Sequence, residues 1–198
     1  MGRPREFDAD QALERALRLF RQKGYEGTSL SDLTEAMGIN RPSLYAAFGN
    51  KEELFRKACD RYAAGPAAFL REALDEPTAR AVVERVLYGT VDVITDPEGP
   101  AGCLSVTGAL ACGEDADSVR QDLCSRRMKF QCEMSRRFER AVTEGDLPAD
   151  ASPDDLARYV ATIYQGMTVQ ASSGACRDSL RRVVDLAMQA WPEPVAAR

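Results

Sequence analysis

Histidine is absent from this sequence of 198 residues. Its absence excludes Ser-His-Asp and Cys-His nucleophilic sites, and metal sites built on imidazole ligands. The cysteines form no CxxC pair and no regular framework, which argues against a disulfide scaffold and a zinc centre; they are Cys59, Cys103, Cys112, Cys124, Cys132 and Cys176. We therefore expect no metal, no cofactor and no enzymatic activity.

Long apolar runs are also missing. No segment approaches the roughly 18 apolar residues of a membrane span, and the charged N-terminal MGRPREF has no apolar stretch behind it. We expect a cytoplasmic protein without a membrane segment. The 44% hydrophobic and 29% charged residues are typical of a globular protein with a buried core.

Acidic residues outnumber basic ones, giving a formal net charge of -5, but the basic residues are unevenly distributed along the chain. Residues 1–57 hold 10 Lys and Arg against 9 Asp and Glu, whereas residues 58–198 hold 16 against 22. Clustering matters more for phosphate contact than the total does. The cations of the first quarter cluster at Arg3 and Arg5 and again at Arg41, Lys51, Arg56 and Lys57.

The spacing of apolar residues predicts an all-α fold of about nine helices. No segment alternates with period two, so no strand is expected. Helix starts are marked by capping residues such as Ser29 with Asp32 and Asn50 with Glu53, and helix ends by glycines. The expected helices cover about 8–23, 29–37, 40–48, 50–62, 82–94, 104–112, 117–144, 152–167 and 180–191.

Two of these helices are short and are joined by a tight turn at Met37-Gly38-Ile39. Their length and turn are typical of a helix-turn-helix, whose second helix enters the DNA major groove. Asn40 can cap the second helix, and Pro42 fits its first turn because the missing N–H costs nothing there. A short capped helix also occurs in helical proteins that do not bind DNA.

The outer face of the second short helix suits an approach to base edges. Leu44 and Phe48 would hold the helix to the core. Arg41 could pair bidentately with guanine or hold a phosphate, and the sequence leaves both open. The small or polar residues expected on the outer face are Asn40, Arg41, Ser43 and Ala46.

The first 55 residues or so carry a specific signature: GYEGTS at 24–29, MGI at 37–39, SLY at 43–45 and FGNKEEL at 48–54. This pattern closely resembles the N-terminal signature of the TetR family of transcriptional regulators. The resemblance implies a helix-turn-helix DNA-binding domain over residues 1–49. It also implies a larger helical effector-binding and dimerisation domain over residues 50–198.

The resemblance also implies roles for single residues. Phosphate contacts would come from Thr28, Ser29, Tyr45 and Lys51, the first two aided by a helix dipole. Arg3 and Arg5 could reach the minor groove as an arm, or merely solubilise the terminus. At Ala47 the family more often has His or Tyr, so we expect one phosphate contact to be missing.

A palindromic double-stranded operator needs two copies of the reading helix, roughly 34 to 36 Å apart or a multiple of that. The family pairs its last two helices as a four-helix bundle. Here these helices carry apolar stripes with small residues at Ala161, Gly166, Ala171 and Ala187. We expect a homodimer through the last two helices; packing within one subunit is the alternative.

The middle helices would then enclose a pocket for a small-molecule effector of unknown identity. Each candidate could instead belong to the core or the surface. The candidates are polar, aromatic or thioether side chains on largely apolar helices: Tyr88, Phe130, Gln131, Tyr164, Gln165, Met167 and Thr168.

Sulfur-bearing residues are further candidates. Cys124, Met128 and Cys132 lie four apart on one helical face, either as adaptable core residues or as part of a thiol sensor. The sequence Gly102-Cys103-Leu104 resembles one subgroup of the family in which some members sense through this cysteine. Cys103 is therefore the best single candidate for a sensing thiol.

Taken together, the sequence predicts a dimeric, ligand-responsive repressor that leaves a palindromic operator when an effector binds. The alternative is a helical ligand-binding or thiol-based electrophile- or oxidant-sensing protein without a DNA-binding role. An enzyme would have to use cysteine or the acidic pairs Asp115/Asp117 and Asp154/Asp155. These pairs lie at expected helix starts, where acids stabilise the helix.

Overall fold

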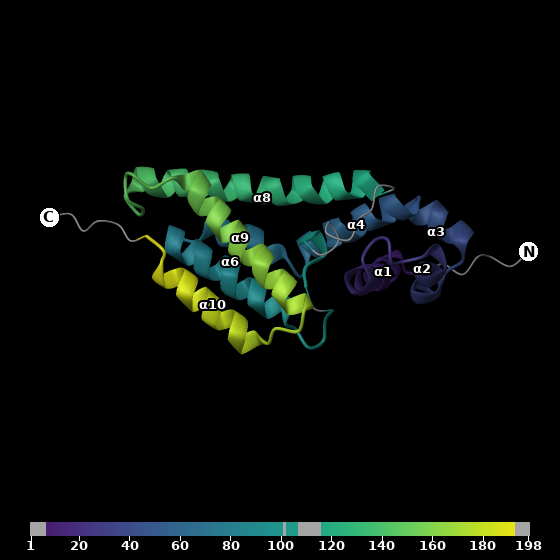
Figure 1. Cartoon of the computed structure of the whole chain (residues 1–198). Coiled ribbons are helices and arrows are strands. Elements are labelled where there is room, and N and C mark those ends of the chain that lie inside the picture. Colours follow the sequence, from purple (N-terminus) through teal and green to yellow (C-terminus); the bar gives the residue numbers. More distant parts are fainter. Residues whose placement is uncertain (1–6, 101, 107–115, 193–198) are drawn as a thin grey trace, which may run out of the picture.

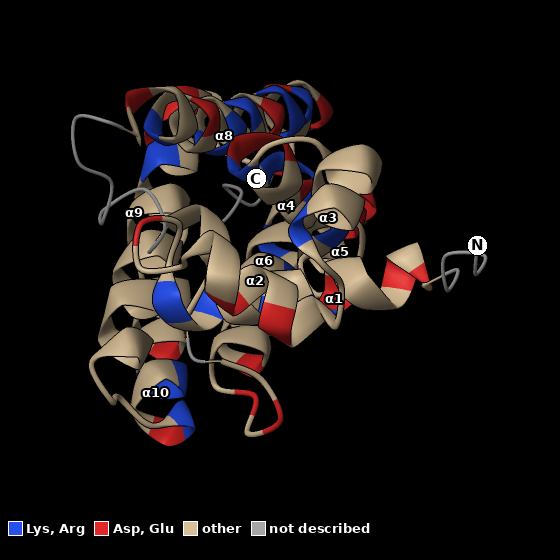
Figure 2. Cartoon of the chain, turned by 90° about the vertical axis from the view of Figure 1, so that its right-hand side faces the viewer, with Lys and Arg blue, Asp and Glu red and all other residues tan. Residues whose placement is uncertain are grey.

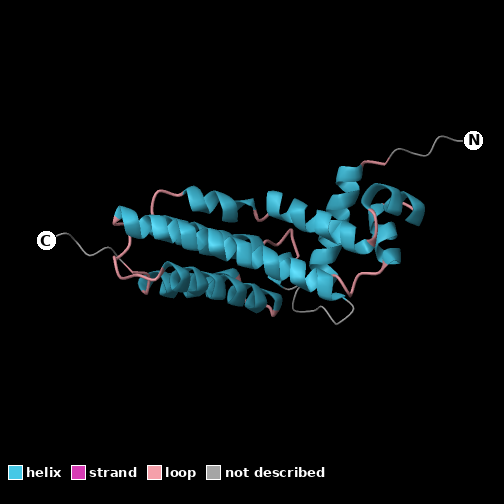
Figure 3. Ribbon diagram, turned by 90° about the horizontal axis from the view of Figure 1, so that it is seen from above, coloured by secondary structure: helices cyan, strands magenta, loops and turns pink. Residues whose placement is uncertain are grey.

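The computed structural model describes residues 7–100, 102–106 and 116–192. Within these ranges the chain forms nine α-helices, one short 3-10 helix and no strand (Figure 3). The expected all-α class is confirmed. Arg3 and Arg5, and most of the helix expected over 104–112, lie outside the described residues.

The helices are numbered in the order in which they follow one another along the chain. The first four are α1 (Ala9–Lys23), α2 (Leu30–Met37), α3 (Arg41–Phe48) and α4 (Lys51–Ala64). The others are α5 (Ala68–Glu72), the 3-10 helix η1 (Ala73–Asp75), α6 (Ala79–Ile94), α8 (Asp117–Glu144), α9 (Pro153–Ser172) and α10 (Arg177–Gln189). Among the described residues none of these helices is long and apolar enough to cross a membrane.

The first four predicted helix starts agree with the structure, whereas α6 and α10 each begin three residues before the expected 82 and 180. The side chains of Asp8, Ser29, Asn40 and Asn50 each accept a backbone N–H of the first turn of the helix that follows. At Ser29 and Asn50 the third helical residue returns the hydrogen bond, completing a capping box. The expectation missed α5 and η1, which are too short to show helical periodicity.

The N-terminal helices pack around aromatic residues. The rings of Phe20 and Phe55 meet nearly at a right angle, with centroids 4.9 Å apart, and Tyr25 lies edge-on to Phe55 at 5.1 Å. Leu33 of α2 and Leu44 of α3 are completely buried in the same core. The two short helices are therefore fixed on α1 and α4.

The remaining helices form an elongated bundle that extends away from this core (Figure 1). The long helix α8, about 42 Å at 1.5 Å per residue, packs on α9; α9 and α10 both pack on α6. α4 leads from the N-terminal helices into the bundle, and the described ends of the chain lie at opposite ends of the molecule (Figure 1).

The short helix α5 is pressed against α6 at a glycine. A Cβ atom placed on Gly89 would stand 2.6 Å from Cδ2 of Phe69, far inside van der Waals contact. Only glycine permits this approach. The position of α5 beside the bundle therefore depends on Gly89.

Candidate DNA-binding surface and effector cavity

The turn between α2 and α3 is closed by backbone hydrogen bonds. Gly38 adopts a left-handed conformation with φ of 69°. Its N–H donates to the carbonyl of Glu35, and the N–H of Ile39 donates to that of Thr34, both at 3.1 Å. A left-handed residue after the last helical turn is where glycine is favoured. The angle between the two helices is thus set locally.

The first turn of α3 is capped and faces solvent. Oδ1 of Asn40 accepts the N–H of Ser43 at 2.8 Å. Ser43 is half-buried. The other residues of this segment that are predicted to contact DNA are exposed, including Tyr45 at 48% of its surface; they are Asn40, Arg41, Pro42, Tyr45 and Ala46.

The guanidinium of Arg41 is held by the neighbouring helix. Its Nη2 donates to Oγ of Ser31 in α2 at 3.0 Å, and the side chain is exposed. A contact to guanine would have to replace or share this hydrogen bond. A phosphate contact could use the other N–H donors, because arginine has five.

Thr28 and Ser29 lie differently, although they are adjacent. Thr28 is completely buried: its hydroxyl donates to the carbonyl of Gly24 at 2.7 Å, and its N–H to that of Tyr25 at 3.3 Å. Its side chain therefore locks the end of α1 and does not reach the surface, unlike the expected phosphate contact. Ser29 is exposed and caps α2 through Asp32.

The carboxylate of Asp32 is stabilised in its charged form. The hydroxyl of Ser29 donates to it at 2.7 Å, and the ammonium of Lys23 at 2.9 Å. These hydrogen bonds hold the pKa of Asp32 well below its usual range. The ends of α1 and α2 are thereby tied together.

Lys51 is partly fixed at the start of α4. Its Nζ lies 4.3 Å from the ring centroid of Tyr25, a cation–π geometry. Burial lowers the pKa of Lys51, and the charge of Glu26 opposes that shift. Lys57 is used otherwise: its Nζ donates to the carbonyls of Ala47 and Phe48 at 3.3 and 3.2 Å, at the end of α3.

Figure 2 views the N-terminal end of the molecule, with α1, α2 and α3 toward the viewer. α2 carries the acidic residues Asp32 and Glu35, and the basic Arg41 of α3 is hydrogen-bonded to Ser31 of the same helix α2. Both signs of charge are thus mixed on the described part of this end. Affinity for DNA would depend on individually placed contacts.

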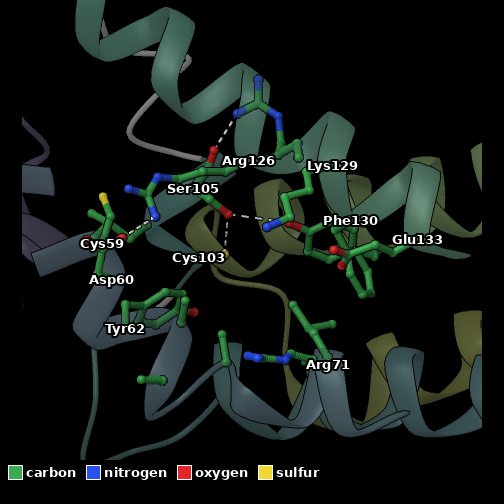
Figure 4. Close-up of a pocket in the computed structure, with 17 residues that line it drawn as sticks. Cys59, Asp60, Tyr62, Arg71, Cys103, Ser105, Arg126, Lys129, Phe130 and Glu133 are labelled. Carbon is green, nitrogen blue, oxygen red and sulfur yellow. Dashed lines mark hydrogen bonds and ion pairs between the residues drawn. The ribbon is translucent and has the colours of Figure 1, made fainter. Parts of the chain in front are cut away.

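A cavity of about 460 Å³ lies among α4, α5, α8 and the segment 103–105, with one residue of α9 at its inner side (Figure 4). Its volume is within the range of small-molecule sites, about 300 to 1,000 Å³. It is lined by Cys59, Asp60, Tyr62, Ala63, Ala64, Ala67, Leu70, Arg71, Cys103, Leu104, Ser105, Arg126, Arg127, Lys129, Phe130, Glu133 and Tyr164.

The inner wall of the cavity carries hydroxyl and thiol groups. Oγ of Ser105 lies 3.1 Å from Sγ of Cys103 and 3.5 Å from the hydroxyl of Tyr164 (Figure 4). Burial raises the pKa values of Tyr62 and Tyr164, so both phenols stay protonated and can donate hydrogen bonds. Burial also raises the pKa of Cys59 to about 12, which keeps that thiol neutral.

Three of the ten residues predicted for the pocket line this cavity: Cys103, Phe130 and Tyr164. The hydroxyl of Tyr88 instead donates to Asp185 of α10 at 2.5 Å, and that of Thr168 to the carbonyl of Tyr164 at 2.9 Å. The other five do not line it and lie elsewhere on α8 and α9: Cys124, Met128, Gln131, Gln165 and Met167.

These five positions differ in burial. Met167 is buried in the core, Met128 is exposed over 56% of its surface, and Sγ of Cys124 accepts a hydrogen bond from Arg127 at 3.1 Å. Gln131 and Gln165 are half-buried. The sulfur row of Cys124, Met128 and Cys132 thus faces away from the core rather than filling it.

Several lining residues were missed by the sequence reasoning. Arg71 lies on α5, whose five residues give no periodic signal. Lys129 and Glu133 lie on the charged face of α8, and such faces are usually solvated. Their spacing of one helical turn beside Phe130 is the only sequence signal that could have pointed to them.

The cavity is connected to the N-terminal helices. The guanidinium of Arg21, on α1, lies over the ring of Tyr62, and its Nη2 donates to the carbonyls of Pro100 at 2.8 Å and Gly102 at 3.5 Å. Gly102 precedes Cys103. Arg21 of α1 therefore contacts one residue that lines the cavity, Tyr62, and the segment directly before another, Cys103.

α4 forms ion pairs with α1 and with α8. Arg61 pairs with Glu14 at 2.8 Å and Asp10 at 3.2 Å, both on α1. Asp60 pairs with Arg126 of α8 at 2.7 Å. The helix that carries Cys59 and Tyr62 into the cavity is thus attached to both parts of the molecule.

Both the N-terminal and the C-terminal part of the chain are similar to known proteins. Residues 12–58 match the family model of bacterial regulatory proteins, tetR family, and residues 77–187 match that of the tetracyclin repressor-like C-terminal domain. The chain is 34% identical over 196 residues to the HTH-type transcriptional repressor ComR of Escherichia coli, covering 98% of this chain and 93% of that protein. It is 30% identical to the uncharacterized HTH-type transcriptional regulator YezE of Bacillus subtilis, covering 95% and 98%.

Among solved structures, the chain is similar to a cysteine-substituted variant of the TetR family transcriptional regulator CifR, complexed with a 26-base-pair double-strand operator DNA. The identity is 44%, the TM-score is 0.91, and the match covers 96% of this chain and all of that one. The two family models and these relatives lead to one conclusion: the chain belongs to the TetR family of transcriptional regulators.

Proposed function

We propose that this protein is a homodimeric transcriptional repressor that binds a palindromic double-stranded operator through α2 and α3. A small-molecule effector in the cavity between α4, α5 and α8 releases it. The observation that carries the proposal is the exposed, Asn40-capped first turn of α3, held on the core by the buried Leu44 and Phe48. Such a turn can enter the major groove without losing its anchor.

The residues proposed to contact DNA are exposed or half-buried. On α3 they are Asn40, Arg41, Pro42, Ser43, Tyr45 and Ala46, with Ser29 and Lys51 holding phosphate on either side. We do not propose Thr28 as a phosphate contact, because its hydroxyl and its N–H both donate hydrogen bonds within the protein. A minor-groove arm formed by Arg3 and Arg5 stays a prediction.

Dimerisation through α9 and α10 is supported by apolar side chains on their outer faces. Tyr159 and Val169 of α9 and Val183 of α10 are well exposed, and Leu186 of α10 is exposed over 65% of its surface. Of the four small residues expected to permit close approach, Gly166 alone is open to solvent. Ala161, Ala171 and Ala187 are buried within the subunit.

Release would require the effector to bind more tightly to a conformation that no longer fits the operator. A shift of tens-fold in operator affinity needs a coupling of about 2 kcal/mol. Arg21 and the ion pairs of α4 supply a physical connection for this coupling. The division into a DNA-binding domain over 1–49 and an effector-binding and dimerisation domain over 50–198 fits this scheme, with α4 as the first element of the second domain.

A thiol-dependent form of the same mechanism centres on Cys103. This thiol lines the cavity, and an electrophile entering there would reach it. Replacing Cys103 by Ser should abolish release by electrophiles such as N-ethylmaleimide while operator binding persists. An unchanged response would exclude Cys103 as the sensor.

The proposal is tested by selecting bound duplexes from a random-sequence pool with the purified protein. We expect enrichment of a palindrome by the wild type and by an Arg140→Ala control, which changes a charge at the far end of α8. We expect no enrichment by an Arg41→Ala, Tyr45→Ala double variant. Equal enrichment by the double variant, or none by any folded protein, would contradict the proposal.

A further inference from the structure

The charges around the cavity are not balanced. Four cationic side chains line it, Arg71, Arg126, Arg127 and Lys129, against the two carboxylates of Asp60 and Glu133. Ligands of a site with this composition meet a net positive charge. Which charges face the ligand depends on the partners that each group already has.

Two of the four cations are used within the protein. Arg126 pairs with Asp60 at 2.7 Å and Asp122 at 2.8 Å, so Asp60 is neutralised together with it. Arg127 donates to the carbonyl of Ser105 and to Sγ of Cys124, neither of which is a carboxylate; in the total, its charge is balanced by Asp122, the second carboxylate paired with Arg126. These contacts build the wall of the cavity and hold its segment 103–105 in place.

The other two cations have no such partner. Within the described ranges, neither Arg71 nor Lys129 forms an ion pair or a side-chain hydrogen bond, and the carboxylate of Glu133 forms none either. Figure 4 shows Lys129 reaching toward the space from α8, with Arg71 of α5 bordering its opposite side and Glu133 farther along α8. Two free cations and one free carboxylate leave a net charge of one positive unit.

The rest of the lining selects for an apolar body. Leu70, Leu104 and Phe130, with the alanines of α4, line the same cavity as the charged groups and the buried Tyr62 and Tyr164. A ligand that extends from the cations to these phenols would bury carbon along most of its length. Burial of this carbon surface favours binding.

We propose that the effector of this cavity is an amphipathic monocarboxylate, whose carboxylate lies between Arg71 and Lys129 and whose apolar body contacts Phe130 and Leu104. This inference rests on the proposed function, in which the cavity is the effector site. A single negative charge balances the free groups, whereas a dianion would be repelled by Glu133 and a cation by the other two. The planar guanidinium of Arg71 matches the two oxygens of a carboxylate.

The charge class is tested by calorimetry on the purified full chain without DNA. The probes are decanoate and 4-phenylbutyrate, with methyl decanoate, 4-phenylbutyramide and decylamine as matched neutral and cationic compounds. We expect at least one acid to bind and its uncharged analogue to bind at least about tenfold more weakly. Binding should also weaken as salt rises. Equal binding of acid and neutral analogue, or binding by neither acid, overturns the proposal.

Variants locate the binding group. Arg71→Gln and Lys129→Gln should each weaken the acid about tenfold, whereas Glu133→Gln should tighten it. Arg136→Gln, which removes an exposed charge of α8 outside the cavity, serves as control and should have no effect. Since Glu133→Gln predicts a gain, a loss of folding cannot imitate it. Unchanged affinity in all three variants overturns the assignment.

The experiments distinguish a failure of the proposed ligand class, a monocarboxylate, from a failure of the proposed function as a ligand-released repressor. If acids bind and the selected operator is not released, the charge class stands and the release mechanism fails. If methyl decanoate releases the operator and neither acid binds, the regulator stands and the charge class fails.

Discussion

The guanidinium carbon of Arg21 lies 5.2 Å from the ring centroid of Tyr62, which joins α1 to the wall of the cavity. The same guanidinium donates to the carbonyls of Pro100 and Gly102, and its buried Nε has no hydrogen-bond partner among the residues that the structure describes. A change in the position of Tyr62 or of the segment before Cys103 would therefore shift Arg21 and, with it, α1.

Replacing Arg21 by Ala should remove the coupling between effector binding and operator affinity. We expect operator affinity to change little, while the effector's influence on it falls from the usual 5- to 150-fold range toward none. Electrophoretic mobility shift with and without saturating effector measures this ratio. Arg18→Ala, one turn earlier and exposed, is the control; an unchanged ratio in Arg21→Ala would show that coupling takes another route.

Lys51→Gln should reduce the salt dependence of operator binding. If Lys51 holds one phosphate, the slope of log K against log salt concentration should become shallower by about one. Fluorescence anisotropy at several salt concentrations measures it. Arg140→Gln, at the far end of α8, should leave the slope unchanged. A slope that is identical in Lys51→Gln would remove this residue from the interface.

Stability of the N-terminal helices should depend on Asp32 in acid. Its pKa is depressed in the folded state, so its contribution is present above the ordinary value of 3.8 and is lost as the pH falls below it. Asp32→Asn should therefore be less stable than the wild type near neutral pH, and the difference should narrow below about pH 4. Urea unfolding at both pH values tests this. A constant difference would contradict the depressed pKa.

The cysteines should differ strongly in reactivity. Hydrogen bonding by Ser179 lowers the pKa of the exposed Cys176, whereas burial raises that of Cys59 to about 12. Because the thiolate is the reactive form, iodoacetamide at pH 7.5 should modify Cys176 early and Cys59 last. Peptide mass spectrometry over time gives the order. Ser179→Ala should slow Cys176 and leave the exposed Cys132 unaffected.

Gly89→Ala should displace α5 from α6. The added Cβ would stand 2.6 Å from the ring of Phe69, and overpacking of this kind costs about 1 to 3 kcal/mol. Since α5 carries Arg71 and Leu70, binding in the cavity should weaken as well. A Gly89→Ala, Phe69→Leu double variant should recover both stability and binding. Additive losses in the double variant would show that the two residues do not interact.

Local signals predicted much of this fold. Ser29, Asn40 and Asn50 cap the helices that follow them because a cap depends on residues at most three positions apart. α5 carried no such signal: Ala67 precedes it without a side-chain cap, and its five residues complete little more than one turn. A polar cap helped at these three starts, but it was not sufficient everywhere: α6 is capped by Thr78 and begins at Ala79, three residues before the expected 82.

The cavity was far less predictable. Helical periodicity identified Phe130 and Tyr164 as candidates for an inner face, but it does not tell which helix that face meets. Tyr88 had the same signal and contacts Asp185 of α10 instead. Cavity residues are brought together by packing between distant elements, and a single sequence carries no direct record of that packing.

Asp60 and Arg61 are consecutive in sequence, yet their side chains are bonded to different parts of the molecule: α8 in one case and α1 in the other. Successive residues of a helix point about 100° apart. Turning α4 about its own axis would therefore pull at least one of these ion pairs apart, whereas tilting the whole helix can carry both partners with it. α4 can therefore tilt as a rigid rod more easily than it can rotate about its own axis. In the proposed mechanism, an occupied cavity would tilt α4 and so change the direction in which α1 to α3 face the DNA.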